Sequence, residues 1–76
     1  MYLYQVIREK QYNVDIGAYF SFGIKIYYIK EHVVQEACTI SDISIDEKKI
    51  HELAAACNIH QLSPLHIFDV IEDFLS

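Results

Sequence analysis

Residues 18–30 read AYFSFGIKIYYIK, and this segment determines the class of fold. Its β-branched and aromatic residues favour a pleated, half-buried strand. Alternate side chains of a strand point to opposite faces. The predicted core face carries Phe20, Phe22, Ile24, Ile26 and Tyr28, and the other face carries Tyr19, Ser21, Gly23, Lys25, Tyr27 and Ile29. Gly23 in the middle indicates a bulge or a close approach of another group to the backbone.

Two further segments, residues 2–12 and 33–43, have the same strand-like composition. Asn13-Val14-Asp15-Ile16-Gly17 separates the first from the second, and Asn, Asp and Gly tolerate the backbone angles of turns. Glu31-His32 is short enough to connect the second to the third. The pattern predicts a three-stranded antiparallel meander.

The remainder of the chain predicts two helices. Ser44-Ile45-Asp46-Glu47 matches a capping box with Ser44 as the N-cap, and Asn58 is a reasonable end of the first helix. The apolar stripe of this helix is Ile50, Leu53, Ala54 and Cys57. Ser63 followed by Pro64 is typical of a second helix start, with an apolar stripe of Ile67, Val70, Ile71 and Phe74. We therefore expect one α+β domain over residues 1–76, a β-β-β-α-α chain with both helices packed on one face of the sheet.

Composition and charge restrict the classes of function. The chain of 76 residues is 53% hydrophobic and carries a net charge of −5. Residues 1–30 hold four basic and two acidic residues, whereas residues 31–76 hold two basic and nine acidic ones. The helical half should repel nucleic acid and anionic membranes. Apolar runs are too short for a membrane helix, no secretory signal is visible, and Cys38 and Cys57 are expected to be free thiols in a cytoplasmic protein.

Candidate catalytic and metal-binding residues lie in the helical half. His51, Cys57, His60 and His66 are of the types that bind zinc, but their spacings match no paired zinc motif, so we expect no metal and no cofactor. His66, Asp69 and Asp73 form a possible polar site, which a small enzyme or metal-binding protein could use. No nucleophile accompanies them, because Ser63 is explained by helix capping. We expect a protein that is not an enzyme and has no catalytic residues.

Tyrosines indicate an interaction surface. If the helices cover the Phe22 side of the sheet, Tyr19, Tyr27 and Ile29 remain on the other side, with Tyr2, Tyr4 or Leu3 of the first strand beside them. Exposed apolar patches mark contacts, and tyrosine is favoured at interfaces. We expect a homo-oligomer, a homodimer above all, or another protein as partner. An alternative uses the tyrosines, with Arg8, Lys10 and Lys25, to stack single-stranded nucleic acid, but the acidic net charge opposes such binding.

Three segments carry a family resemblance: Ser21-Phe22-Gly23-Ile24, Ile40-Ser41-Asp42-Ile43, and Leu62-Ser63-Pro64-Leu65-His66 with Asp69-Val70-Ile71-Glu72-Asp73 after it. They resemble a family of short uncharacterised proteins of Gram-positive Firmicutes, a domain of unknown function. The resemblance implies a bacterial cytoplasmic protein. It supplies no catalytic or binding residues.

Overall fold

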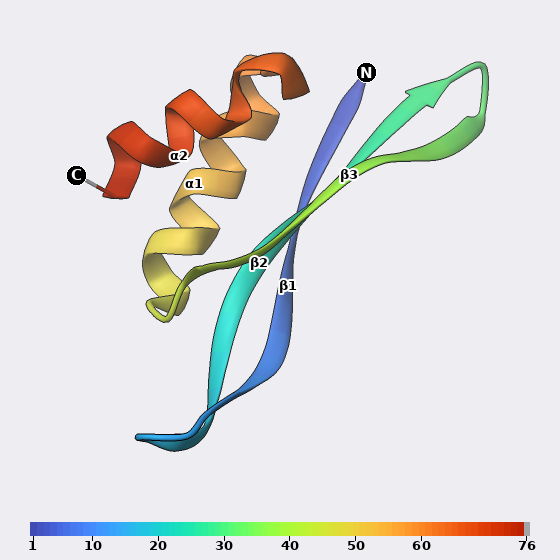
Figure 1. Ribbon diagram of the computed structural model, residues 1–76. Coiled ribbons are helices and arrows are strands. Elements are labelled where there is room, and N and C mark those ends of the chain that lie inside the picture. The colour runs from blue at the N-terminus through green and yellow to red at the C-terminus, as the bar shows by residue number, and fades with distance from the viewer. Residues whose placement is uncertain (76) are drawn as a thin grey trace.

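The computed structural model describes residues 1–75 as a three-stranded antiparallel sheet followed by two helices (Figure 1). The strands are β1 (Tyr2–Asn13), β2 (Gly17–Lys30) and β3 (Val33–Ser44), in the spatial order β1-β2-β3. They are followed by α1 (Glu47–His60), a 3₁₀ turn η1 (Pro64–His66) and α2 (Ile67–Leu75). The predicted α+β fold with a β-β-β-α-α meander is confirmed. Within residues 1–75, neither helix has the length and apolar composition needed to cross a membrane.

Gly23 lies where the β2–β3 pairing is irregular. Phe22 pairs with Ser44 whereas Ile24 pairs with Ile40, so the additional residues belong to β3. The alternation of faces along β2 therefore continues through Gly23. A side chain at this position would collide with the Ile40 carbonyl oxygen and would place its Cβ 2.9 Å from Glu9 Oε1. Glycine is required here because neighbouring groups approach the backbone closely.

The turn between β2 and β3 consists of the predicted Glu31 and His32. Both residues have positive φ angles, 52° and 66°, as in the tight turns that match the twist of a hairpin. Such angles are disfavoured for residues with a side chain. The hairpin therefore contains a strained two-residue connection.

The first helix begins later than its sequence suggests. Asp46, not Ser44, is the N-cap, since Asp46 Oδ1 accepts the Lys49 N–H at 3.2 Å. Ser44 is the last residue of β3, and its hydroxyl instead accepts the Asp46 N–H at 3.0 Å. The predicted capping box is wrong because β3 continues through Ser44 to pair with Phe22.

Asn58 does not end the first helix, which continues to His60 with Gln61 as the C-cap at a φ of 48°. Its side chain instead binds the backbone of β1: Asn58 Oδ1 accepts the Tyr4 N–H at 2.7 Å and Asn58 Nδ2 donates to the Tyr4 carbonyl at 2.9 Å. Gln61 repeats this arrangement at Tyr2, with distances of 2.9 and 3.0 Å. We call these two residues the amide clamp. It attaches the end of α1 to the outer edge of β1.

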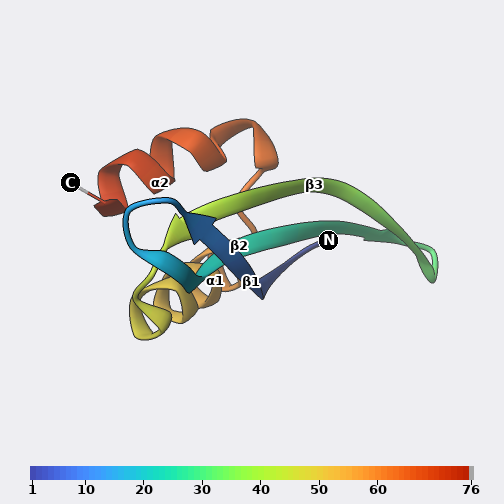
Figure 2. The same cartoon turned by 60° about the horizontal axis from the view of Figure 1, so that its bottom comes forward.

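The core lies between the helices and one face of the sheet. Its buried residues are Tyr4, Phe22, Ile24, Ile26, Ile50, Leu53, Ala54, Cys57, Ile67 and Ile71. The predicted core face is right for Phe22, Ile24 and Ile26, but Phe20 is 52% exposed. The 14-residue helix α1 spans about 21 Å, whereas even the 12-residue strands β1 and β3 span about 40 Å. The β1–β2 end of the sheet therefore extends past α1 (Figure 1), and the β2–β3 hairpin extends past the helices at the other end (Figure 2). Phe20 lies 4.6 Å beneath the Arg8 guanidinium instead.

Candidate interaction surface

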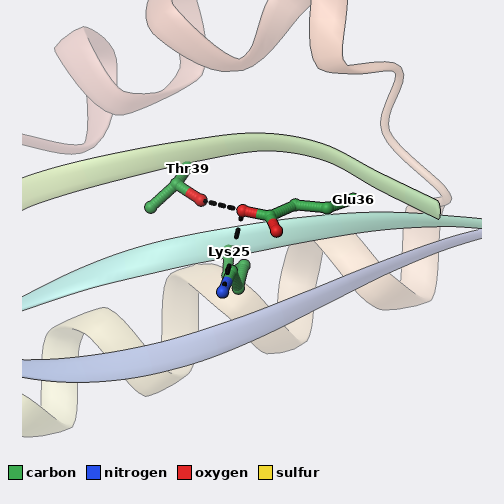
Figure 3. Close-up of polar contacts among 3 residues, drawn as sticks. All are labelled: Lys25, Glu36 and Thr39. Carbon is green, nitrogen blue, oxygen red and sulfur yellow. Dashed lines mark hydrogen bonds and ion pairs between the residues drawn. The ribbon is translucent and has the colours of Figure 1, made fainter.

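Neither helix within residues 1–75 covers the second face of the sheet, although the β3 irregularity lies against Gly23 there and Ser21 on this face is buried. The strand register assigns to this open face Leu3, Ile7, Tyr19, Lys25, Tyr27, Ile29, Glu36 and Thr39. Figure 3 views this side, with α1 passing behind β1 and β2. The apolar and aromatic members of the set are mostly half-buried by their neighbours, and Leu3 is 39% exposed. The open face is thus a mixed apolar and polar surface.

A polar cluster crosses the middle of the open face. Lys25 Nζ lies 3.6 Å from Glu36 Oε1, and the Thr39 hydroxyl donates to the same oxygen at 2.8 Å (Figure 3). The side chain of Lys25 is 33% exposed and that of Glu36 is 53% exposed. Ion pairs this accessible to water contribute little to stability. The Lys25–Glu36 pair matters here because it places one positive and one negative charge side by side on the open face.

The tyrosines expected on this surface are divided between the two faces. Tyr19, Tyr27 and Ile29 lie on the open face. Tyr2 and Tyr4 pair with Tyr28 and Ile26 and lie on the side of the helices, so the expectation that either accompanies Tyr27 is wrong. Leu3, the third candidate in the first strand, pairs with Tyr27 and takes that place. The strand composition alone left the phase of the first strand undetermined.

Tyr4 is a core residue. It is 2% exposed, and its hydroxyl donates to the Leu62 carbonyl oxygen. Burial raises the pKa of Tyr4 to about 12, with smaller contributions from Cys57, Tyr2 and Cys38. Burial also raises the pKa of the Cys57 thiol, which is therefore a poor nucleophile. Tyr2 packs at the margin of the core, with its ring 5.3 Å from that of Tyr28.

The residues considered for chemistry lie in α1, η1 and α2. His66 lies in η1, Asp69 and Asp73 lie in α2, and all three are exposed. The Ser63 hydroxyl is occupied as a cap, accepting the Leu65 N–H at 3.4 Å. His51 lies 3.8 Å from Glu47 in α1. Within residues 1–75, no group of three or more His, Cys, Asp or Glu side chains is placed to hold a metal ion.

The basic residues of the nucleic-acid alternative do not lie together. Arg8 and Lys10 pair with Phe22 and Phe20 and share their face, whereas Lys25 lies on the open face with Tyr27. A stacking platform for single-stranded bases needs cationic side chains along the same groove as the aromatic rings. Of the three, only Lys25 shares a face with Tyr19 and Tyr27.

Sequence reasoning missed two members of the polar cluster, Glu36 and Thr39. Glu36 lies opposite Tyr27 in the register that the two-residue turn sets, whereas Thr39 lies opposite Lys25 only because of the irregularity between Ile26 and Tyr27. An additional residue in β3 at that point changes which side chains face Lys25. The alternation in the second strand predicted the face of Lys25, and the two-residue turn carried a signal for Glu36, but no local signal indicated Thr39.

The fold and its surface define a small α+β protein with a three-stranded meander, one helix-covered face and one open face. The chain belongs to DUF6514, a family of unknown function whose model matches residues 1–76. This agrees with the resemblance to an uncharacterised domain family. Neither the curated proteins nor the solved structures contain a significant match to the chain.

Proposed function

We propose that this protein is a non-catalytic interaction module that self-associates by stacking the open faces of two copies. The proposal rests on the Lys25–Glu36 ion pair, which lies at the centre of the open face among apolar and aromatic side chains. In a two-fold symmetric dimer, each residue meets the same patch of the partner. Lys25 of one copy then lies against Glu36 of the other, and the reverse contact forms as well.

The size of the face supports a weak dimer. Strands of 12 residues are about 40 Å long, and three strands are about 14 Å across. This gives about 560 Å² per copy and about 1,100 Å² in total, near the lower limit for a specific interface. We therefore expect reversible association that depends on protein concentration. A bacterial cytoplasmic setting, implied by the family resemblance, completes the proposal.

Charge-swapped variants test the dimer. Lys25→Glu places two acidic residues at the centre of each face and Glu36→Lys places two basic ones. We expect wild-type protein to dimerise in sedimentation equilibrium at high concentration and each variant to be monomeric, because like charges meet across the two-fold axis. An equimolar mixture of the two variants should form a heterodimer.

Lys48→Glu is the matched control, since it makes the same change of charge on the exposed surface of α1 and should leave the dimer intact. A strictly monomeric wild-type protein would overturn the proposal. So would two variants that fail to associate when mixed while the wild type dimerises.

A further inference from the structure

The outer edge of β1 is open along most of its length. Met1 exchanges backbone hydrogen bonds with Ile29 of β2, at 3.1 and 2.7 Å, and the amide clamp occupies the outward groups of Tyr2 and Tyr4. Even-numbered residues of β1 therefore direct their N–H and C=O groups away from β2. The β1–β2 register is unbroken to Asn13. We call Val6, Arg8, Lys10 and Tyr12 the open edge of β1. Within residues 1–75, the outward backbone N–H and C=O groups of these four residues have no hydrogen-bond partner.

A groove follows the start of this edge. It has a volume of about 470 Å³ and lies between β1 and α1. Its lining includes Val6 from the strand and His51, Ala54, Ala55 and Asn58 from the helix. Peptides that extend a sheet bind in this kind of position, with backbone hydrogen bonds to the edge and side chains in pockets beside it. Small alanine side chains leave room there for an apolar residue of such a peptide.

The charges beside the edge specify the sequence that fits. Arg8 and Lys10 are exposed and share a face with Val6. A residue directly opposite another across two strands has its side chain on the same face, close enough to interact. Acidic residues opposite Arg8 and Lys10, and an apolar residue opposite Val6, match this edge.

A second copy of β1 does not match it. When the open edges of two copies pair antiparallel over their full length, Val6 of one copy lies opposite Tyr12 of the other. Arg8 then lies opposite Lys10. The same register places Glu9 opposite Glu9 on the other face. Like charges directly opposite each other destabilise a strand pair. Charged side chains on an edge strand commonly prevent self-pairing in this way.

We propose that the open edge of β1 binds an extended acidic segment of another protein, added antiparallel to the strand with the pattern Glu-x-Glu-x-Val. The two glutamates lie opposite Lys10 and Arg8, and the valine lies opposite Val6 in the groove beside Ala54 and Ala55. This site is separate from the open face, so it does not depend on self-association.

A labelled peptide, Thr-Glu-Thr-Glu-Thr-Val-Thr with blocked ends, tests the proposal by fluorescence anisotropy on the full chain. We expect it to bind about tenfold more tightly than the same peptide with lysine in place of glutamate, because two exposed charge pairs are gained. Amide resonances of residues 6–12 should shift on titration. Absence of binding by the acidic peptide, or equal binding of both peptides, would overturn the proposal.

Two matched comparisons isolate the backbone contact. Lys10→Ala and Lys10→Pro remove the same charge, but only proline deletes the outward N–H, a change that an edge strand tolerates. We expect Lys10→Pro to bind about fivefold more weakly than Lys10→Ala, the loss of one hydrogen bond. The acidic peptide methylated on the nitrogen of the glutamate opposite Arg8 should show a similar loss with wild-type protein. Equal binding of the methylated and unmethylated peptides would contradict strand addition even if Lys10→Pro did not fold.

Discussion

The Asn58 side chain and the Tyr4 backbone form a reciprocal pair of hydrogen bonds, at 2.7 and 2.9 Å. The amide of Asn58 thus supplies the donor and acceptor that a neighbouring strand would supply. Both groups are partly buried, so an unpaired partner would carry a desolvation cost. The pair joins the first strand to the end of the first helix without a covalent link.

Asn58→Asp tests this contact because it keeps the shape of the side chain and removes the donor. We expect a loss of about 2 kcal/mol in the free energy of unfolding at neutral pH, since a carboxylate then faces the Tyr4 carbonyl. Urea denaturation measures the loss. Gln61→Glu, the same change at the exposed half of the amide clamp, should cost about 1 kcal/mol or less. Equal losses of stability in the two variants would contradict the expectation that Asn58 stabilises the fold more than Gln61 does.

Gly23→Ala should destabilise the sheet. The new Cβ collides with the Ile40 carbonyl oxygen, a backbone atom that cannot move without disturbing the β2–β3 pairing. We expect a loss of about 2 kcal/mol, the usual range for overpacking. Gly17→Ala is the control, because nothing lies within 4 Å of its Cβ and only the φ of +81° opposes the substitution. Wild-type stability in Gly23→Ala would show that the close approach is not required.

The raised pKa of Tyr4 makes stability depend on alkaline pH. Tyr4 stays protonated in the folded chain up to about pH 12, whereas tyrosine in the unfolded chain ionises near pH 10. The unfolded state therefore loses its proton first, and stability falls as the pH rises from about 10 towards 12. Urea midpoints at a series of pH values measure this decline.

Tyr4→Phe separates this contribution from that of the other tyrosines. At pH 8 the variant should be less stable by about 1 kcal/mol, because the hydrogen bond to Leu62 is lost. Above pH 10 its stability should fall less steeply than that of the wild type. Parallel declines in the two proteins would refute the assignment to Tyr4.

The β2–β3 turn can be made more stable by substituting its two residues. Replacing Glu31-His32 with Asn-Gly should stabilise the protein by about 1 kcal/mol, since these residues accept positive φ angles more readily. Thermal and urea unfolding measure the gain. Glu31→Ala provides the control, as it removes the charge without relieving the backbone. A gain of equal size in Glu31→Ala would point to electrostatics as the cause.

The sequence predicted the elements of the fold better than their ends. Period-two alternation identified the second strand, and Phe22, Ile24 and Ile26 are buried as expected. Phe20 follows the same alternation yet is exposed, because a local pattern does not report how far the covering helix reaches. Ser44 has the chemistry of a cap, but pairing with Phe22 retains it in the sheet. Both outcomes depend on the arrangement of elements distant in the sequence, which a local pattern does not report.

The candidate surface was predicted only where it depends on one strand. Tyr19, Tyr27 and Ile29 share a face by alternation alone. The faces of Tyr2 and Tyr4 depend on the phase of the first strand relative to the second, and strand composition does not fix that phase. The position of Thr39 opposite Lys25 depends on one additional residue in β3. Asn58 gave no signal of its role, since an amide that binds a distant backbone resembles any other polar residue near a helix end.

The amide clamp also has a consequence for the order of events during synthesis. Tyr4 and Asn58 are 54 residues apart, so the ribosome makes the first strand well before its partner. At about 5–20 residues per second, that interval lasts about 3–10 s. During this interval the whole outer edge of β1 is available to form backbone hydrogen bonds with another chain. When the amide clamp forms, it occupies the outward backbone groups of Tyr2 and Tyr4. The nascent chain is protected from wrong pairing at these residues only from that time.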